Sequence, residues 1–126
     1  MSGFREILAY QKAFKVAMMV FHLSKRFPPE EKYSLTDQCR RSSRSVAAQF
    51  AEAYRKRRYP AHFISKLTDS DGENSETQVW LDFAVECGYV TSQDVKEIMT
   101  LSLEVGQMLG SMIDHPEKWC LPTKRP

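Results

Sequence analysis

Apolar residues recur three and four positions apart in four segments of the chain, and no segment alternates apolar and polar residues as a strand does. The segments cover about residues 4–26, 35–56, 60–87 and 92–113. Prolines follow the first and the fourth, at Pro28 and Pro116, where they prevent the helix from continuing. The pattern predicts an all-α chain, a single antiparallel up-down four-helix bundle domain with a loose tail over residues 115–126.

The third segment contains a polar stretch, Asp69–Ser75, whose composition is typical of a loop. The apolar residues on either side, Phe63, Leu67, Leu81 and Val85, nevertheless fall within about 40° of one another at 100° per residue. A loop has no reason to preserve this phase. We therefore predict one long helix with a polar middle.

The ends of the predicted helices carry capping residues. Ser34 is a candidate N-cap for the second helix, with Asp37 in its first turn. Gly88 is a candidate C′ residue for the third helix, and Thr91 with Asp94 is a candidate capping pair for the fourth.

Composition and charge narrow the class of protein. The formal net charge of +2 excludes a strongly basic, histone-like protein, although it allows a local basic patch. Three cysteines are too few for a disulfide framework. No apolar run approaches the ~20 residues of a membrane span, and Arg5 and Glu6 interrupt any signal-like start. We expect a cytoplasmic protein that does not bind a membrane.

The second helical segment is strongly basic. Between Gln38 and Arg58 only Glu52 opposes seven basic side chains, which are Arg40, Arg41, Arg44, Arg55, Lys56, Arg57 and Arg58. On a helix, four of the arginines share an arc of about 60°, and the basic row spans about 27 Å. Between Lys66 and Glu86, by contrast, six carboxylates oppose one lysine.

Two interpretations of this charge layout remain open. The basic strip is suited to the phosphates of RNA or DNA, because arginine forks match phosphate oxygens. Tyr54 and Tyr59 flank its end and could stack on bases, or simply pack. Alternatively, the two helices pair their opposite charges within the chain or between subunits. We predict that Glu52 and Glu76 form structural ion pairs with the group Arg40, Arg41 and Arg44, and are not catalytic acids.

A second set of residues favours self-association. Ala47, Ala48 and Ala51 lie between the arginines and would let another helix approach closely. Val79, Trp80 and Phe83 lie opposite the core positions of the third helix, which makes its second half apolar nearly all round. A second buried surface of this kind predicts an interface between copies of the chain.

The residues indicate no catalytic or metal chemistry. His22, His62 and His115 lie far apart, and none follows a Glu-x-x-His pattern. An EF-hand register starting at Asp69 would require Glu at position 80, where the chain has Trp80. Because phosphate loops and nucleophile elbows are also missing, we expect no enzyme, no cofactor, no metal and no small-molecule substrate.

Several short motifs follow one another in an order that resembles a known family. They are Ala9-Tyr-Gln-Lys-Ala13, Phe27-Pro28, Glu31, Tyr33-Ser-Leu35, Gln38-Cys-Arg-Arg41, Ser45-Val-Ala-Ala-Gln-Phe-Ala-Glu52, and Gly72 with Glu76. Together they resemble the four-helix bundle proteins encoded in intervening sequences of bacterial 23S rRNA genes, often labelled S23 ribosomal protein. The match runs from about Phe4 to Ile113, and the accessory variability proteins of diversity-generating retroelements look related.

The resemblance implies properties that the residue pattern alone does not. It implies an unbroken third helix and assembly as a ring-like, barrel-shaped homopentamer. It also implies that the retroelement relatives bind nucleic acid and a reverse transcriptase through basic surfaces, while the intervening-sequence members have no settled biochemical role.

Residues and resemblance together lead to one leading hypothesis, a small non-enzymatic oligomer that binds nucleic acid or a nucleoprotein partner through the basic strip. A structural or protein-interaction module, with its arginines used in internal and inter-subunit ion pairs, remains the alternative. A cofactor-independent enzyme with a site at a subunit interface is a third and weaker one.

Overall fold

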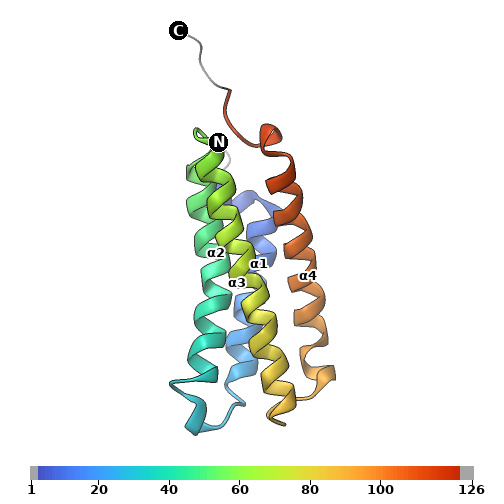
Figure 1. The fold of residues 1–126 in the computed structure, drawn as a ribbon. Coiled ribbons are helices and arrows are strands. Elements are labelled where there is room, and N and C mark those ends of the chain that lie inside the picture. The colour runs from blue at the N-terminus through green and yellow to red at the C-terminus, as the bar shows by residue number, and fades with distance from the viewer. Residues whose placement is uncertain (1–2, 123–126) are drawn as a thin grey trace.

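The computed structural model describes residues 3–122, and within that range every regular element is a helix (Figure 1). The long helices are α1 (Leu8–Ser24), α2 (Leu35–Arg55), α3 (Pro60–Glu86) and α4 (Ser92–Asp114). The short 3-10 turns are η1 (Phe4–Glu6), η2 (Pro29–Glu31) and η3 (Pro116–Lys118). The prediction of an all-α chain with four helices is confirmed.

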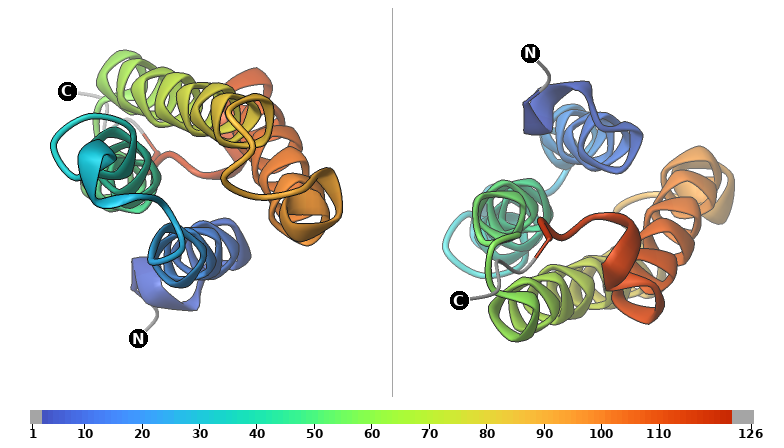
Figure 2. Two further views of the ribbon diagram at one scale, coloured as in Figure 1. Left: turned by 90° about the horizontal axis from the view of Figure 1, so that it is seen from below. Right: turned by 90° about the horizontal axis from the view of Figure 1, so that it is seen from above.

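The four helices lie side by side along one long axis (Figure 1). Helix α2 packs against both α1 and α3, and α4 packs against both α3 and α1. Seen end-on, the helices surround a shared interior (Figure 2). The start of α1, the α2–α3 turn and the end of α4 lie at one end of the molecule, whereas η2 and the α3–α4 turn lie at the other (Figure 1).

Apolar side chains from all four helices fill most of the interior. Phe63, Leu67 and Leu81 of α3 have no exposed surface, and Phe50 of α2 and Leu109 of α4 are each 1% exposed. Burying a side chain of this size contributes about 1.5–3 kcal/mol relative to leaving it in water. These contacts determine how each helix is rotated, and therefore which side chains remain outside.

Helix α3 is continuous through the polar stretch Asp69–Ser75, and part of this stretch faces the interior. The buried Ser70 hydroxyl donates a hydrogen bond to the Val46 carbonyl at 2.7 Å. The buried Thr77 and Ser42 hydroxyls share another hydrogen bond, also 2.7 Å long. The polar middle of α3 is thus part of the core, where it ties α3 to α2.

A second polar pair joins α3 to α4. The Asn74 amide nitrogen donates to the Ser102 carbonyl at 2.9 Å, and the Ser102 hydroxyl donates to Asn74 Oδ1 at 2.8 Å. Gln78 Nε2 also donates to the Ser102 hydroxyl, at 2.9 Å. Among residues 3–122, no buried side-chain nitrogen or oxygen lacks a hydrogen-bond partner. Because partnered groups avoid the cost of desolvation, this seam can specify helix register without destabilising the core.

Ser34 is the N-cap residue of α2, as predicted, but its side chain does not accept a hydrogen bond from the helix backbone. Its hydroxyl donates to Glu31 Oε1, and the same carboxylate oxygen accepts a hydrogen bond from the Leu35 amide at 3.1 Å. Glu31 reaches the helix start because η2 turns it back toward α2. The Ser34 hydrogen bond comes first among the interactions that lower the pKa of Glu31. The Tyr89 hydroxyl donates to the other oxygen at 2.7 Å, which joins η2 to the α3–α4 turn.

The other predicted helix ends agree with the structure except at the start of the chain. Thr91 and Asp94 form a reciprocal capping box at the start of α4. Gly88 follows α3 with φ of +78°, a left-handed conformation that favours glycine. Helix α1 begins at Leu8 rather than at the predicted residue 4, because Ile7 has an extended backbone with ψ of 131°.

Candidate functional site

The basic residues predicted on the second helix form two separate groups in the structure. Arg40, Arg41 and Arg44 lie on the first half of α2, near η2. Arg55 is the last residue of α2, and Lys56, Arg57 and Arg58 lie in the turn that leads to α3. The basic row predicted for a segment that is helical throughout is not completed, because α2 ends at Arg55; Arg44 and Arg55 are about 17 Å apart at 1.5 Å per residue.

Arg41 is held by two carboxylates of α3. Its Nη2 lies 2.7 Å from Glu76 Oε1, and its Nη1 lies 3.2 Å from Glu73 Oε2. The hydrogen bond with Glu73 is the main cause that raises the pKa of Arg41. The Trp80 indole nitrogen donates to the same Glu76 oxygen at 3.2 Å. Arg41 therefore connects α2 to α3 and has little capacity left for an external anion.

Glu52 does not pair with an arginine, so that part of the prediction is wrong. Its Oε1 lies 3.2 Å from Lys66 Nζ. Lys66 also donates to Gln49 Oε1 at 2.8 Å. The rotation of α2 that buries Phe50 turns Glu52 toward α3, away from the group Arg40, Arg41 and Arg44.

Arg40 and Arg44 point to the α1 side of α2. Arg40 is half-buried, and its Nε donates to the Ser24 hydroxyl at 2.7 Å. Arg44 is exposed. Within residues 3–122, neither guanidinium has a carboxylate partner. These two cations are available to an external anion in a way that Arg41 is not.

The cluster at the end of α2 is also divided. Arg57 lies over the Tyr54 ring, 3.6 Å from its centroid, and its Nε donates to the Tyr54 carbonyl at 2.8 Å. Tyr54 is only 7% exposed, so it cannot stack on a base, whereas Tyr59 is 57% exposed. Arg55 and Arg58 are exposed and form no ion pair or side-chain hydrogen bond with the described residues.

Arg55, Arg57 and Arg58 line a depression of about 350 Å³ together with Tyr54 and Leu121. The Leu121 amide donates to the Arg57 carbonyl at 3.0 Å, so the segment after η3 is tied to the α2–α3 turn. Lys56 is half-buried at the C-terminus of α2. The exposed charge of this cluster therefore comes mainly from Arg55 and Arg58.

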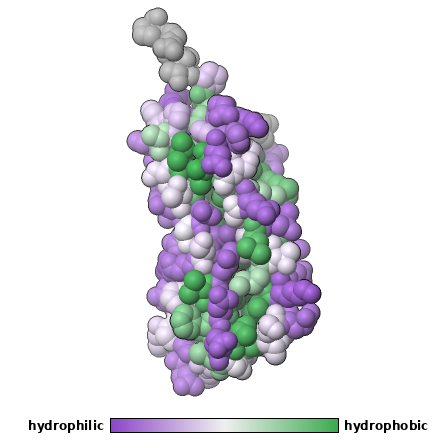
Figure 3. Space-filling view, turned by 45° about the vertical axis from the view of Figure 1, so that its right-hand side comes forward, coloured by the Kyte–Doolittle hydropathy of each residue, from purple (hydrophilic) through white to green (hydrophobic). Residues whose placement is uncertain are grey.

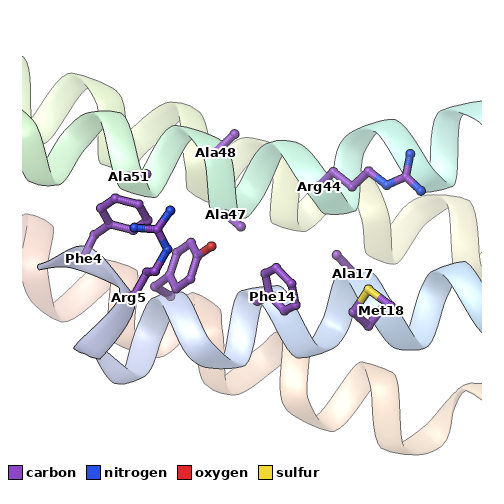
Figure 4. A pocket seen from close by; sticks show the side chains of 10 residues that line it. Phe4, Arg5, Phe14, Ala17, Met18, Arg44, Ala47, Ala48 and Ala51 are labelled. Carbon is purple, nitrogen blue, oxygen red and sulfur yellow. The ribbon is translucent and has the colours of Figure 1, made fainter.

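An apolar groove of about 440 Å³ runs between α1 and α2 (Figure 4). Phe4, Phe14 and Met18 lie on its α1 side, where Phe14 is 51% and Met18 41% exposed. The predicted small residues Ala47, Ala48 and Ala51 line its α2 side, together with Arg44. The sequence prediction identified these alanines but not the aromatic residues opposite them.

The second predicted apolar surface lies on α3. Val79 is 46% and Phe83 52% exposed, and the Trp80 ring packs against the Phe83 ring at 6.1 Å between centroids. Trp80 and Phe83 also line a groove of about 440 Å³ with Cys87, Tyr33 and other residues between Glu31 and Gln38. Hydrophobic groups likewise reach the surface between hydrophilic ones on the face shown in Figure 3.

The part of the chain that the structure describes brings together no group of three or more His, Cys, Asp or Glu side chains that could hold a metal ion. No described helix is both long enough and apolar enough to cross a membrane. The surfaces that stand out are thus the two basic groups and the two apolar grooves.

The comparison with protein families assigns the chain. A family model described as 23S rRNA-intervening sequence protein matches residues 5–111. The chain belongs to this family. Among solved structures, it is similar to a protein of unknown function from the S23 ribosomal protein family of Bacteroides thetaiotaomicron, with 29% sequence identity and a TM-score of 0.76. The similarity covers 84% of this chain and 98% of the other. No curated protein matches the chain.

In this family member, two of the interactions that sequence reasoning missed cross between helices. Ser24 of α1 holds Arg40 of α2, and Lys66 of α3 holds Glu52 of α2. Ser24 could have been noticed as a polar residue near the C-terminal end of an apolar stripe. Its partner depends on how α1 and α2 cross, which the spacing of residues along one helix does not reveal.

Proposed function

We propose that the protein is a small, non-enzymatic, cytoplasmic four-helix bundle of antiparallel up-down topology that self-associates and binds nucleic acid or a nucleoprotein partner. One observation carries the nucleic-acid role: Arg55 and Arg58 project from one end of the molecule without a carboxylate partner in the described chain. Exposed, unpaired arginines suit phosphate oxygens, and binding through them is mostly independent of base sequence.

Two apolar surfaces on different helices support self-association. One is the groove of α1 and α2 with Phe14, Met18 and the three alanines, and the other contains Val79, Trp80 and Phe83. Two unlike surfaces favour a head-to-tail contact, which produces a ring when the rotation between neighbours closes. The resemblance to the family supplies the number five.

A pair of charge reversals tests the nucleic-acid role. The variant Arg55→Glu/Arg58→Glu should no longer retard RNA or single-stranded DNA in a gel at low salt. Lys15→Glu/Lys96→Glu is the matched control, because both lysines are exposed and the change in charge is the same. Equal retardation by the two variants would contradict the proposed site.

Light scattering on a sizing column tests the assembly. The protein should elute with a mass about five times 14.6 kDa. Phe83→Glu should dissociate the oligomer, whereas Leu103→Glu, at an α4 residue 58% exposed, should not. A monomer at micromolar concentration would refute self-association.

The alternative function, a protein-interaction module without a nucleic-acid role, is favoured by one observation. Arg41 already forms ion pairs with Glu73 and Glu76. The alternative expects such ion pairs for Arg40 and Arg44 as well. Absence of any RNA or DNA binding at low salt, combined with an intact oligomer, would support this alternative.

A further inference from the structure

Three cations from two helices converge on a single aromatic ring. The Phe21 ring of α1 has Lys25 Nζ 4.6 Å from its centroid, the Arg40 guanidinium carbon at 5.0 Å and the Arg44 guanidinium carbon at 5.9 Å. Each distance is within the range of a cation–π interaction. The ring thus gathers side chains from α1 and α2 into one compact positive group, which we call the Phe21 cluster.

The position of Arg40 in the Phe21 cluster is constrained from within the bundle. Its Nε donates to the Ser24 hydroxyl at 2.7 Å, and that hydroxyl donates to the Phe21 carbonyl at 3.0 Å. Ser24 is only 2% exposed. Because Nε is bound internally, the two terminal nitrogens of the guanidinium remain as donors for another group. An arginine held in this way loses little side-chain freedom when it binds an anion.

No carboxylate among residues 3–122 lies within 4.0 Å of the side-chain nitrogens of Lys25, Arg40 or Arg44. Three like charges beside one ring repel each other, and the ring carries no net charge to neutralise them. The helix dipole can stabilise one of these three charges, because Lys25 lies at the C-terminus of α1, where a cation is favourable. That explanation does not extend to Arg40 and Arg44.

A hollow of about 540 Å³ adjoins this cluster. Its lining residues are Lys32, Tyr33, Thr36, Asp37, Arg40, Arg44 and the glutamate-bound Arg41. Tyr33 is 85% exposed, with Lys32 Nζ 5.3 Å from its ring centroid. Asp37 is a carboxylate in the hollow and opposes anion binding there. The hollow therefore offers cations for a phosphate and an open aromatic face for a base.

We infer that the Phe21 cluster and the adjoining hollow form a phosphate-binding site, occupied by the phosphodiester backbone of a single-stranded nucleic acid. The inference deepens the proposed function and rests on it, because it assigns a second contact point on α2, away from Arg55 and Arg58. It also brings in residues of α1 and of the turn after η2 that a strip on one helix does not include. Lys25, Arg40 and Arg44 hold phosphate oxygens, Phe21 and Ser24 position these cations, and Tyr33 stacks on a base.

Fluorescence anisotropy with a labelled single-stranded RNA tests this site, with the unmodified protein, Arg40→Gln/Arg44→Gln, and the control Lys15→Gln/Lys96→Gln. For single strands, log K falls with log salt with a slope of about −0.7 per phosphate contact. Loss of two contacts should make the slope shallower by about 1.4 for Arg40→Gln/Arg44→Gln only. Asp37→Asn should bind more tightly than the unmodified protein, since it removes the opposing charge.

Tripolyphosphate, which has no base, distinguishes the binding of free phosphate from the binding of a nucleic acid. Titrated alone, it should compete with the RNA for the unmodified protein and lose this effect in Arg40→Gln/Arg44→Gln. Tyr33→Leu should weaken RNA binding at least about fivefold, the lower limit for one stacked base, while leaving tripolyphosphate competition unchanged. Equal effects on both ligands would mean that the site binds phosphate without recognising a base, and would overturn the assignment to nucleic acid.

The outcomes separate this inference from the proposed function. If RNA binding depends on Arg55 and Arg58 but Arg40→Gln/Arg44→Gln behaves like the control, the Phe21 cluster is not a phosphate site. If the unmodified protein binds no RNA, the proposed function fails, and direct calorimetric titration with tripolyphosphate then decides the phosphate site alone. If Arg40→Gln/Arg44→Gln instead changes the mass measured by light scattering, an acidic surface of a second copy covers the cluster, which overturns the inference.

Discussion

The buried pair of Asn74 and Ser102 provides a quantitative test of how α3 and α4 are held in register. Asn74 is 2% exposed and Ser102 is fully buried, and each side chain donates one hydrogen bond to the other residue. Asn74→Ala removes both hydrogen bonds, at about 1 kcal/mol each, and leaves the Ser102 hydroxyl proton without an acceptor, at about 1–3 kcal/mol. The free energy of unfolding should therefore fall by about 3–5 kcal/mol.

The complementary change should also be costly, but the two costs should not add. Ser102→Ala removes two hydrogen bonds, from the Ser102 hydroxyl to Asn74 Oδ1 and from Gln78 Nε2 to that hydroxyl, and leaves Asn74 Oδ1 without a donor, so it should cost about 3–5 kcal/mol. In the double variant neither Oδ1 nor the Ser102 hydroxyl remains unmatched, so its cost should be that of the three lost hydrogen bonds, about 3 kcal/mol. The coupling energy between the two residues should then be about 3 kcal/mol or more.

Urea denaturation at a fixed protomer concentration measures all four proteins of this cycle. The concentration must be constant because self-association would contribute to the apparent stability. A thermal scan should agree. In a chain of this length, the melting temperature should fall by roughly 4 °C for each kcal/mol of unfolding free energy that is lost. Additive costs, within about 0.5 kcal/mol, would refute the reasoning, since they would mean that the two side chains act independently.

Three further results are expected. Gly88→Ala should lower the free energy of unfolding by about 1–2 kcal/mol in urea denaturation, because a Cβ is strained at φ of +78° even though the space around it is open. The hydrogen bond from Arg26 is the main cause that lowers the pKa of Asp94 to about 2, so its contribution to stability is present above its unfolded pKa of about 3.9 and is lost as the pH falls through about 2. Asp94→Asn should therefore show a flatter profile of unfolding free energy in that acid window. Arg41→Gln should leave the salt slope of RNA binding unchanged in anisotropy titrations, because two glutamates of α3 already hold this arginine.

The periodicity of the sequence was sufficient for the secondary structure. Every long helix coincides with a predicted segment to within about four residues at either end, because the buried apolar positions recur with the helical period. The phase of Phe63, Leu67 and Leu81 correctly indicated that α3 continues through Asp69–Ser75. Composition alone indicated a loop there, since it does not show that Ser70 would find a partner across the core.

The side-chain pairs of the candidate site were less predictable. Charge counting placed Glu52 with the arginines, but the rotation of α2 brings it to Lys66. The same counting treated Arg40, Arg41 and Arg44 as one group, whereas they face different neighbours in the structure. Which side of a helix faces which partner depends on packing between helices that are distant in sequence, and the spacing within one helix does not contain this information.

The proposed function requires that the protein bind nucleic acid through unpaired cations on α2 and in the turn that follows it. The most direct measurement is the affinity of the unmodified protein for a single-stranded RNA as a function of salt. If Arg40, Arg44, Arg55 and Arg58 each contact one phosphate, log K should fall with log salt with a slope of about −3 or steeper. Absence of binding at low salt, or an affinity that does not change with salt, would contradict the claim.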